Sequence, residues 1–141
     1  MRYFFDTSAL VKRYIQESGS ILIDRTFDEA NEILVSAVTR IETISAFRRL
    51  MGEKNISEAD YKKVKSELDK DFEDFTILPV SQKTLNKAYQ IVDTEDLRTL
   101  DAIQLATVIL ASKNIDQLVV ADQRLLSAAE NNNIDILDPL K

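Results

Sequence analysis

Short apolar runs alternate with longer amphipathic stretches along this chain of 141 residues. The apolar runs are rich in β-branched and aromatic residues, which is typical of buried strands. They predict strands at Tyr3–Phe5, Ile33–Ser36, Phe75–Val80, Leu118–Ala121 and Ile134–Leu137. The stretches between them carry apolar residues at helical spacing. They predict helices at Ser8–Gln16, Ser20–Glu29, Ala37–Gly52, Ser57–Phe72, Gln82–Thr94, Leu100–Lys113 and Gln123–Asn132.

Strands that alternate with helices predict an α/β fold, with a central parallel sheet and helices on both of its faces. The chain has only two glycines and two prolines, and no low-complexity linker divides it. No repeat at solenoid periods occurs. We therefore expect a single domain over residues 1–141.

The composition restricts the chemistry that the chain can perform. The sequence has no cysteine and no histidine, which excludes thiolate catalysis, the Ser-His-Asp arrangement and nearly all transition-metal sites. Carboxylates must then carry most of any catalysis, and their natural partner is an oxygen-preferring cation such as Mg²⁺ or Mn²⁺.

The net charge of −6 argues mildly against a dedicated polyanion-binding surface, although a cluster of acids that binds a cation would account for part of it. With no membrane-spanning run and no secretory signal, we expect a cytoplasmic protein.

Two aspartates follow predicted strands and precede predicted helices. Asp6 ends the run Tyr3–Phe5, and Asp122 follows Leu118–Ala121. Ligands of open α/β sheets bind beyond the carboxyl ends of parallel strands, so both carboxylates are candidates for a site. Each is explained equally well as a residue of a helix start. For the first helix, Thr7 or Ser8 can be the capping residue, and Asp6 as a turn or cap residue is the alternative.

Two further acids lie in predicted helices. Glu42 has apolar neighbours on several sides and is expected to flank a partly buried face, although a surface glutamate near Arg40 or Arg49 is the alternative. Asp101 begins the unusually apolar stretch that starts at Leu100. An acid in the first helical turn, after Thr99 as the expected cap, is also favoured by the helix dipole alone.

If Asp6, Glu42, Asp101 and Asp122 converge on one edge of the sheet, their charges repel. Two carboxylates about 5 Å apart repel by roughly 3 kcal/mol at an effective dielectric constant near 20. A bound cation, or a raised pKa on one member, must offset that cost. A convergent cluster of these acids therefore implies a divalent metal.

Four segments of the chain, in this order and at family-like spacing, resemble PIN-domain proteins and most of all the stand-alone VapC-type toxins of prokaryotic toxin–antitoxin pairs. They are Phe5–Lys12, Ile41–Ala46, Leu97–Ala106 and Val120–Leu125. The resemblance implies a three-layer α/β/α fold and Mg²⁺- or Mn²⁺-dependent cleavage of RNA. It matches Asp6, Glu42, Asp101 and Asp122 to the family's acidic quartet. It also gives Ser8, with Thr7 beside it, a supporting role.

The sequence departs from the family pattern at two positions. Many relatives carry Thr or Ser where this chain has Val120, so we expect a hydrogen bond to a carboxylate to be missing there. Many also carry His where this chain has Gln104, a side chain that we expect to touch no metal ligand.

Hydrolysis by an activated water, with Glu42 as an accessory base or outer-sphere ligand, should leave 5′-phosphate and 3′-hydroxyl ends.

The resemblance also implies partners. Among the cations near the motifs, Arg98 and Arg124 lie beside proposed metal-binding acids, and Lys12 follows the first motif; these are candidates for contacts with RNA phosphates. A toxin implies a small antitoxin that enters the active site and binds operator DNA. A homodimer is also expected, with apolar faces in Ala37–Met51 and Ile21–Phe27 as candidate interfaces.

Two other classes of function remain to be weighed. One is a PIN-like module that binds RNA or protein without cutting, which the Val120 departure and the acidic net charge favour. The other is phosphoryl transfer through an aspartyl phosphate. Dehalogenase-type phosphatases need a second aspartate where this chain has Ser8, and response-regulator receivers need an aspartate after the third strand, where Ser81 and Gln82 stand. The sequence therefore argues against phosphoryl transfer.

Overall fold

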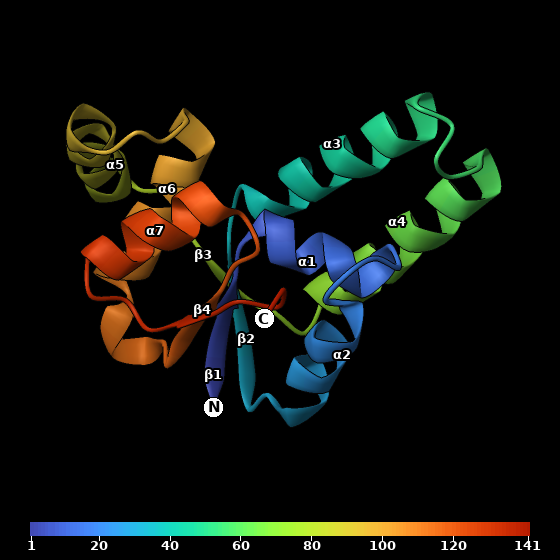
Figure 1. Cartoon of the computed structure of the whole chain (residues 1–141), viewed down its shortest axis with the longest axis horizontal. Helices are drawn as coiled ribbons and strands as arrows, with labels where there is room; N and C mark the ends of the chain where they lie inside the picture. Colours follow the sequence, from blue (N-terminus) through green and yellow to red (C-terminus); the bar gives the residue numbers. More distant parts are fainter.

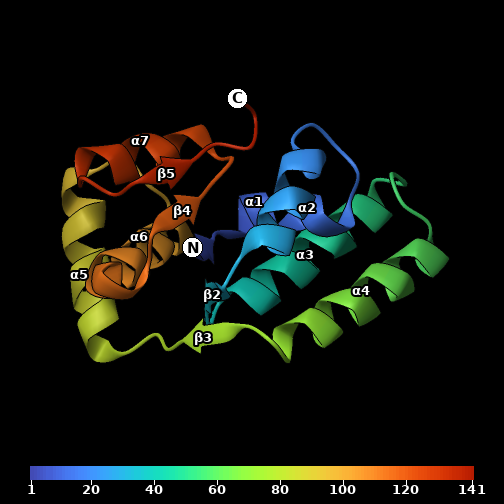
Figure 2. The same cartoon turned by 90° about the horizontal axis from the view of Figure 1, so that it is seen from below.

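A five-stranded, fully parallel sheet forms the centre of the molecule, in the strand order β3-β2-β1-β4-β5 (Figures 1 and 2). The computed structural model describes all residues from 1 to 141. The strands are β1 (Arg2–Phe5), β2 (Glu32–Ser36), β3 (Thr76–Leu78), β4 (Gln117–Val119) and β5 (Ile136–Leu137). All five strands predicted from the sequence are thus present, and the last three are shorter than predicted.

Seven α-helices connect the strands. They are α1 (Thr7–Tyr14), α2 (Ser20–Glu29), α3 (Thr39–Gly52), α4 (Glu58–Phe72), α5 (Gln82–Thr94), α6 (Thr99–Leu110) and α7 (Gln123–Asn131). Each corresponds to a predicted helix. The largest difference is at the end of α6, which stops at Leu110 and is followed by a short 3₁₀ turn at Ser112–Asn114. No helix is both long and apolar enough to cross a membrane.

The helices cover the sheet in two layers, as Figure 2 shows: α1–α4 lie on one face and α5–α7 on the other. Strand β1 contributes side chains to the hydrophobic clusters on both faces of the sheet, because successive side chains of a strand point to opposite faces. Phe4 packs into the cluster formed with α5, α6 and α7, whereas Tyr3 and Phe5 pack into the cluster formed with α1–α4. The predicted three-layer α/β/α architecture is therefore confirmed.

The order of the strands places a topological switch point between β1 and β4. From β1 the chain moves outward to β2 and β3 through helices on one face, then returns to β4 and β5 through helices on the other. Phe4 pairs with Leu118 in register, and the amide of Asp6 donates to the carbonyl of Val119 at 3.2 Å. Sheets of this kind open a crevice at the carboxyl ends of the strands flanking the switch point. Asp6 and Asp122 follow those two strands.

The hairpin of α3 and α4 extends away from the sheet in both views (Figures 1 and 2). Its base remains close to the carboxyl edge, because α3 starts at Thr39, three residues after β2 ends at Ser36. Glu42 lies in the first turn of α3. Asp101 lies in the first turn of α6. The fold therefore brings the starts of four helices, α1, α3, α6 and α7, to one edge of the sheet.

Candidate functional site

All four predicted acids line a single cleft at the carboxyl edge of β1 and β4. The cleft has a volume of about 330 Å³, and its lining includes Asp6, Glu42, Asp101 and Asp122 together with Ser8. Glu42, Asp101 and Asp122 also border an adjoining hollow of about 560 Å³, which the side chains of Arg49 and Arg98 help to form. The acids come from four separate segments of the sequence, so their convergence is a property of the tertiary structure.

Asp6 is the most buried of the four acids, with 2% of its surface exposed. Its Oδ1 accepts the amide of Ala9 at 3.1 Å, which makes Asp6 itself the N-cap of α1. The alternative that Asp6 is a cap residue is therefore confirmed, and neither Thr7 nor Ser8 caps this helix. The helix begins directly after Asp6, whose extended backbone is the conformation that an N-cap requires. Burial raises the pKa of Asp6 from 3.8 to about 7, against the opposing effect of the hydrogen bond from Ser8.

The hydroxyl of Ser8 joins the ends of the two strands that flank the switch point. Its Oγ lies 2.8 and 2.9 Å from the two carboxylate oxygens of Asp6, to which it donates. The same Oγ accepts the backbone amides of Ala121 and Asp122 at 3.1 and 3.0 Å. One donor and two acceptor positions are all that a hydroxyl has, so Ser8 is fully used and fixes the loop after β4 relative to Asp6.

Glu42 is held by groups from α1 and α6. Its Oε1 accepts the hydroxyl of Thr7 at 3.1 Å and the side-chain amide of Gln104 at 2.9 Å. The expectation that Gln104 touches no candidate ligand is therefore wrong. Gln104 lies one helical turn after Asp101 on the buried side of α6, and the sequence alone does not reveal which side chains of α1 and α3 face it.

Asp101 and Asp122 complete the cleft. Burial raises the pKa of Asp101, and the negative charges of Asp122 and Glu42 raise it further, whereas Arg98 opposes the shift. Asp122 is exposed and is the N-cap of α7, since its Oδ1 accepts the amide of Leu125 at 3.0 Å. Helix α6 starts at Thr99, and its N-cap is Arg98 without a side-chain hydrogen bond. The expectation of a Thr99 cap is therefore wrong.

Val120, one of the departures from the family pattern, is completely buried and packs in the core cluster beneath α5, α6 and α7. It contributes no hydrogen bond to a carboxylate, as expected from its side chain. The neighbouring backbone is nevertheless fixed, because Ser8 accepts the two amides that follow Val120. Ser8 thus gives this loop a polar anchor from the start of α1.

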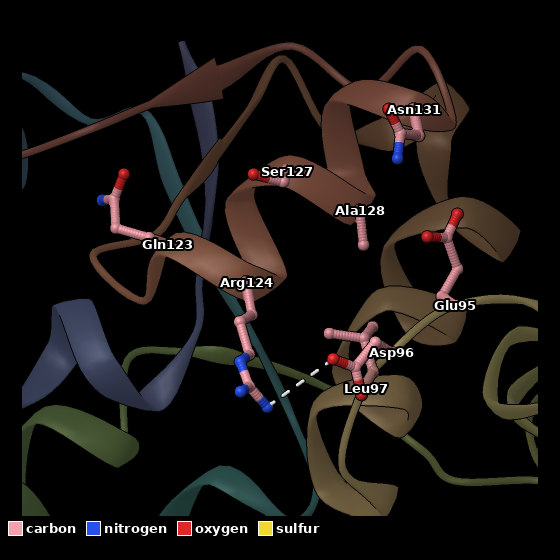
Figure 3. A pocket seen from close by; sticks show the side chains of 8 residues that line it. All are labelled: Glu95, Asp96, Leu97, Gln123, Arg124, Ser127, Ala128 and Asn131. Atoms are coloured by element: carbon pink, nitrogen blue, oxygen red, sulfur yellow. Dashed lines mark ion pairs between the residues drawn. The ribbon is translucent and has the colours of Figure 1, made fainter.

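The three cations predicted to contact RNA lie in different settings. Arg98 is exposed at the rim of the larger hollow. Arg124 borders a separate hollow of about 400 Å³ beside α7, where Figure 3 shows its guanidinium directed toward Asp96 at 4.0 Å. Lys12 is buried, and its Nζ is paired with Glu17 at 3.0 Å. Arg98 and Arg124 are therefore far more accessible to a phosphate than Lys12.

Arg49 lines both hollows at the acidic site and has no ion-pair partner within the chain. It lies seven residues after Glu42 on α3, and this spacing of two helical turns puts both side chains on the same face of the helix. That spacing is the signal that would have distinguished Arg49 from the other arginines of α3.

The donor set of the cleft fits a hard divalent cation in its chemistry. All four candidate ligands are carboxylates, the type of oxygen ligand that Mg²⁺ and Mn²⁺ favour. The negative charges of Asp122 and Glu42 contribute to the raised pKa of Asp101, and a cation bound among them would relieve this repulsion. As the side chains stand, however, no three acids lie close enough together to hold a metal ion.

The fold and the cleft define an α/β protein with an acidic site at the switch point of a parallel sheet. Residues 3–131 match the PIN domain, and the chain belongs to the PIN-domain family. Ribonuclease VapC46 of Mycobacterium tuberculosis is similar over nearly its whole length, with 27% identity over 136 residues that cover 96% of each chain.

Solved structures with the same fold include toxins of toxin–antitoxin systems. A toxin–antitoxin complex from Klebsiella pneumoniae matches with a TM-score of 0.70, 15% identity and coverage of 97% of each chain. VapC20 of Mycobacterium tuberculosis, described as a toxin that cleaves the sarcin–ricin loop, matches with a TM-score of 0.69 and 14% identity, over 89% of this chain and 94% of its own. At this identity, both matches support the fold.

The raised pKa of Asp6 predicts how the stability of the metal-free protein depends on pH. The pKa is about 7 in the folded state, so folding retains a proton that the unfolded chain releases near pH 4. The resulting stabilisation is complete at low pH and is lost as the pH rises through 7. The metal-free protein should therefore be less stable at pH 8 than at pH 5. Asp6→Asn, which keeps a good N-cap, should raise the free energy of unfolding at pH 8 by on the order of 1–3 kcal/mol.

Urea unfolding in EDTA at the two pH values measures this effect. Asp135→Asn changes an exposed aspartate outside the cleft and should keep the pH dependence of the wild type. If Asp6→Asn lost as much stability between pH 5 and pH 8 as the wild type, the buried carboxyl of Asp6 would not be the group responsible.

Proposed function

We propose that this protein is a Mg²⁺- or Mn²⁺-dependent endoribonuclease and the toxin of a type II toxin–antitoxin pair. The observation that carries the proposal is the convergence of Asp6, Glu42, Asp101 and Asp122 on one cleft at the switch point of a PIN-domain fold. The similarity to Ribonuclease VapC46 supports RNA as the substrate.

Within this proposal, Asp6, Asp101 and Asp122 are the metal ligands, and Glu42 binds directly or through water. When bound, the cation would lower the pKa of a water molecule and offset negative charge on the phosphate. Ser8 and the amide of Ala9 hold the carboxylate of Asp6 in place. Thr7 supports Glu42 in the same way. Glu42 is half-buried and free of any cationic partner, which suits it to accept a proton from the attacking water.

The reaction is hydrolysis. The oxygen of water bonds to phosphorus, the bond from phosphorus to the 3′ oxygen breaks, and the leaving oxygen takes up a proton. The products then carry 5′-phosphate and 3′-hydroxyl ends. Attack by the ribose 2′-hydroxyl would instead give 2′,3′-cyclic phosphates.

Cleavage should depend on the cation and on Asp6. Asp6→Asn should lower the rate of RNA cleavage in Mg²⁺ by roughly 100-fold or more, because loss of a direct ligand should exceed the 10–100-fold cost of losing an outer partner. EDTA should abolish cleavage, and Mn²⁺ should restore it. Asp135→Asn is the matched control and should cut like the wild type. Analysis of the product ends tests the chemistry, and 2′,3′-cyclic phosphates would contradict it.

The second candidate is a PIN-like module that binds RNA or protein without cutting. The present separation of the acids, which lets no three of them share an ion, favours this candidate. Calorimetric titration with Mn²⁺ separates the two. Absence of binding to the wild type, together with absence of cleavage, would favour the module over the nuclease.

Arg98 at the rim of the larger hollow and Arg124 beside α7 are the proposed contacts for RNA phosphates, and Lys12 is a third candidate with little exposed surface. Each phosphate contact contributes about 0.7 to the slope of log affinity against log salt concentration for single strands. Arg98→Ala and Arg124→Ala should each flatten the slope by about that amount. The measurement needs an Asp6→Asn background so that RNA is bound without being cut.

Arg25 is an exposed arginine of α2 outside the cleft, and Arg25→Ala is the control that should leave the salt slope unchanged. A slope that stays the same in Arg98→Ala or in Arg124→Ala would remove that residue from the path of the RNA.

We also propose a protein antitoxin and a homodimer as partners. The solved complex from Klebsiella pneumoniae supports the first. In the two candidate segments Ala37–Met51 and Ile21–Phe27, the residues Ile23, Phe27, Ile44 and Phe47 pack in the core, whereas Ile41 and Ile21 are exposed. A larger exposed apolar group lies on α5 and the start of α6, where Leu85, Tyr89, Val92 and Leu100 surround or adjoin a groove of about 470 Å³.

Two charge substitutions, one on α2 and one on α5, test these two helices separately as parts of an interface. Tyr89 is 77% exposed and Ile21 is 73% exposed, so Tyr89→Glu or Ile21→Glu should leave folding intact and disrupt only the interface that contains the changed residue. Light scattering after gel filtration gives the oligomeric state. A wild-type protein that stays monomeric at high concentration would contradict the homodimer.

A further inference from the structure

The side chain of Gln104 lies at the back of the acidic cleft and connects three helices. It is 2% exposed, on the buried face of α6. Its Nε2 is 2.9 Å from Oε1 of Glu42, 3.1 Å from Oγ1 of Thr39 and 3.3 Å from Oγ1 of Thr7. A single amide thus contacts the first turns of α1 and α3 from within the core.

The hydrogen bonds of this amide fix the orientation of Glu42. The amide has two hydrogens for three acceptors, and the contact with the carboxylate is the shortest and involves an ionised acceptor, which makes it the strongest of the three. Thr7 donates its own hydroxyl hydrogen to the same oxygen at 3.1 Å. Oε1 of Glu42 therefore receives two donors, whereas Oε2 receives none from the protein and is left for the cleft.

The other end of the Gln104 amide is unsatisfied. Its Oε1 is the one buried side-chain oxygen or nitrogen of the chain without a hydrogen-bond partner. Rotating the amide by 180° would place its oxygen 2.9 Å from the carboxylate oxygen of Glu42, where two acceptors repel, so the orientation with Nε2 toward Glu42 is the favoured one. A buried acceptor without a partner destabilises a fold, and an apolar side chain of the same length would remove that cost. An amide is nevertheless present at this position, and the strongest contact that it makes is the one with Glu42.

We propose that Gln104 is a positioning residue for the acidic site. It holds one oxygen of Glu42 so that the other is presented to the cleft that Asp101 and Asp122 also line. This inference rests on the proposed function, because it assigns Glu42 a role toward a cation or its bound water. Gln104 touches neither and acts only through Glu42.

The test compares Gln104→Met with the wild type in two measurements. Methionine keeps the length and the burial of the side chain but donates no hydrogen bond. Loss of an outer partner of a ligand should weaken Mn²⁺ binding, measured by calorimetry, by about 10–100-fold. The melting temperature of the metal-free protein should change little, because loss of the hydrogen bonds to Glu42, Thr39 and Thr7 is offset by removal of the unsatisfied oxygen. A residue with a purely structural role would instead lower the melting temperature and leave the Mn²⁺ affinity unchanged.

Two further variants show whether the effect passes through Glu42. In a Glu42→Ala background, Gln104→Met should have little additional effect on Mn²⁺ affinity. Thr107→Val removes another buried hydroxyl of α6, one that donates to Ile103, and should leave the affinity unchanged.

Each outcome decides between the proposals. A wild type that binds Mn²⁺ and cuts RNA, with Gln104→Met equal to it in affinity, would overturn the inference and leave the proposed function intact. The inference would also be overturned if Gln104→Met weakened binding equally with and without Glu42. A wild type that neither binds Mn²⁺ nor cuts RNA would overturn the proposed function, and with it the role of Gln104.

Discussion

The crowding of negative charge at the carboxyl edge of β1 and β4 is the constraint to which the rest of the site responds. Asp6 is buried there with a pKa near 7, and the charges of Asp122 and Glu42 raise the pKa of Asp101. The fold tolerates this arrangement because hydroxyl and amide donors from Ser8, Ala9 and other residues surround the most buried carboxylates. The remaining repulsion is what a divalent cation would relieve.

In three of the acids, the two carboxylate oxygens make different contacts. Asp122 uses Oδ1 to cap α7, and Glu42 uses Oε1 to accept from Thr7 and Gln104. In both side chains the second oxygen has no partner within the protein. Asp6 also caps its helix through one oxygen, although Ser8 contacts both of them. A carboxylate can therefore accept a hydrogen bond from the fold with one oxygen and still present its other oxygen to the cleft.

The fold was largely predictable because its signals are local. A strand such as β1 reads directly from Tyr3–Phe5, and α5 begins and ends at the predicted residues Gln82 and Thr94. The errors fall at element ends, where several residues compete for one role. Asp6 and Arg98 occupy the N-cap positions for which Thr7 or Ser8 and Thr99 were candidates, since the exact start of a helix depends on how the chain before it is held.

The sequence by itself determined the class of fold, the absence of histidine and cysteine chemistry, and the four acids that meet at one edge. Strand ends and helix starts are local features, and parallel strands bring their carboxyl ends together whatever the details of packing. Only the tertiary structure decided which neutral residues serve those acids. Gln104 lies 62 positions from Glu42, and Ser8 lies 114 positions from Asp122. Such contacts depend on how helices from different parts of the chain pack against each other, which no local pattern records.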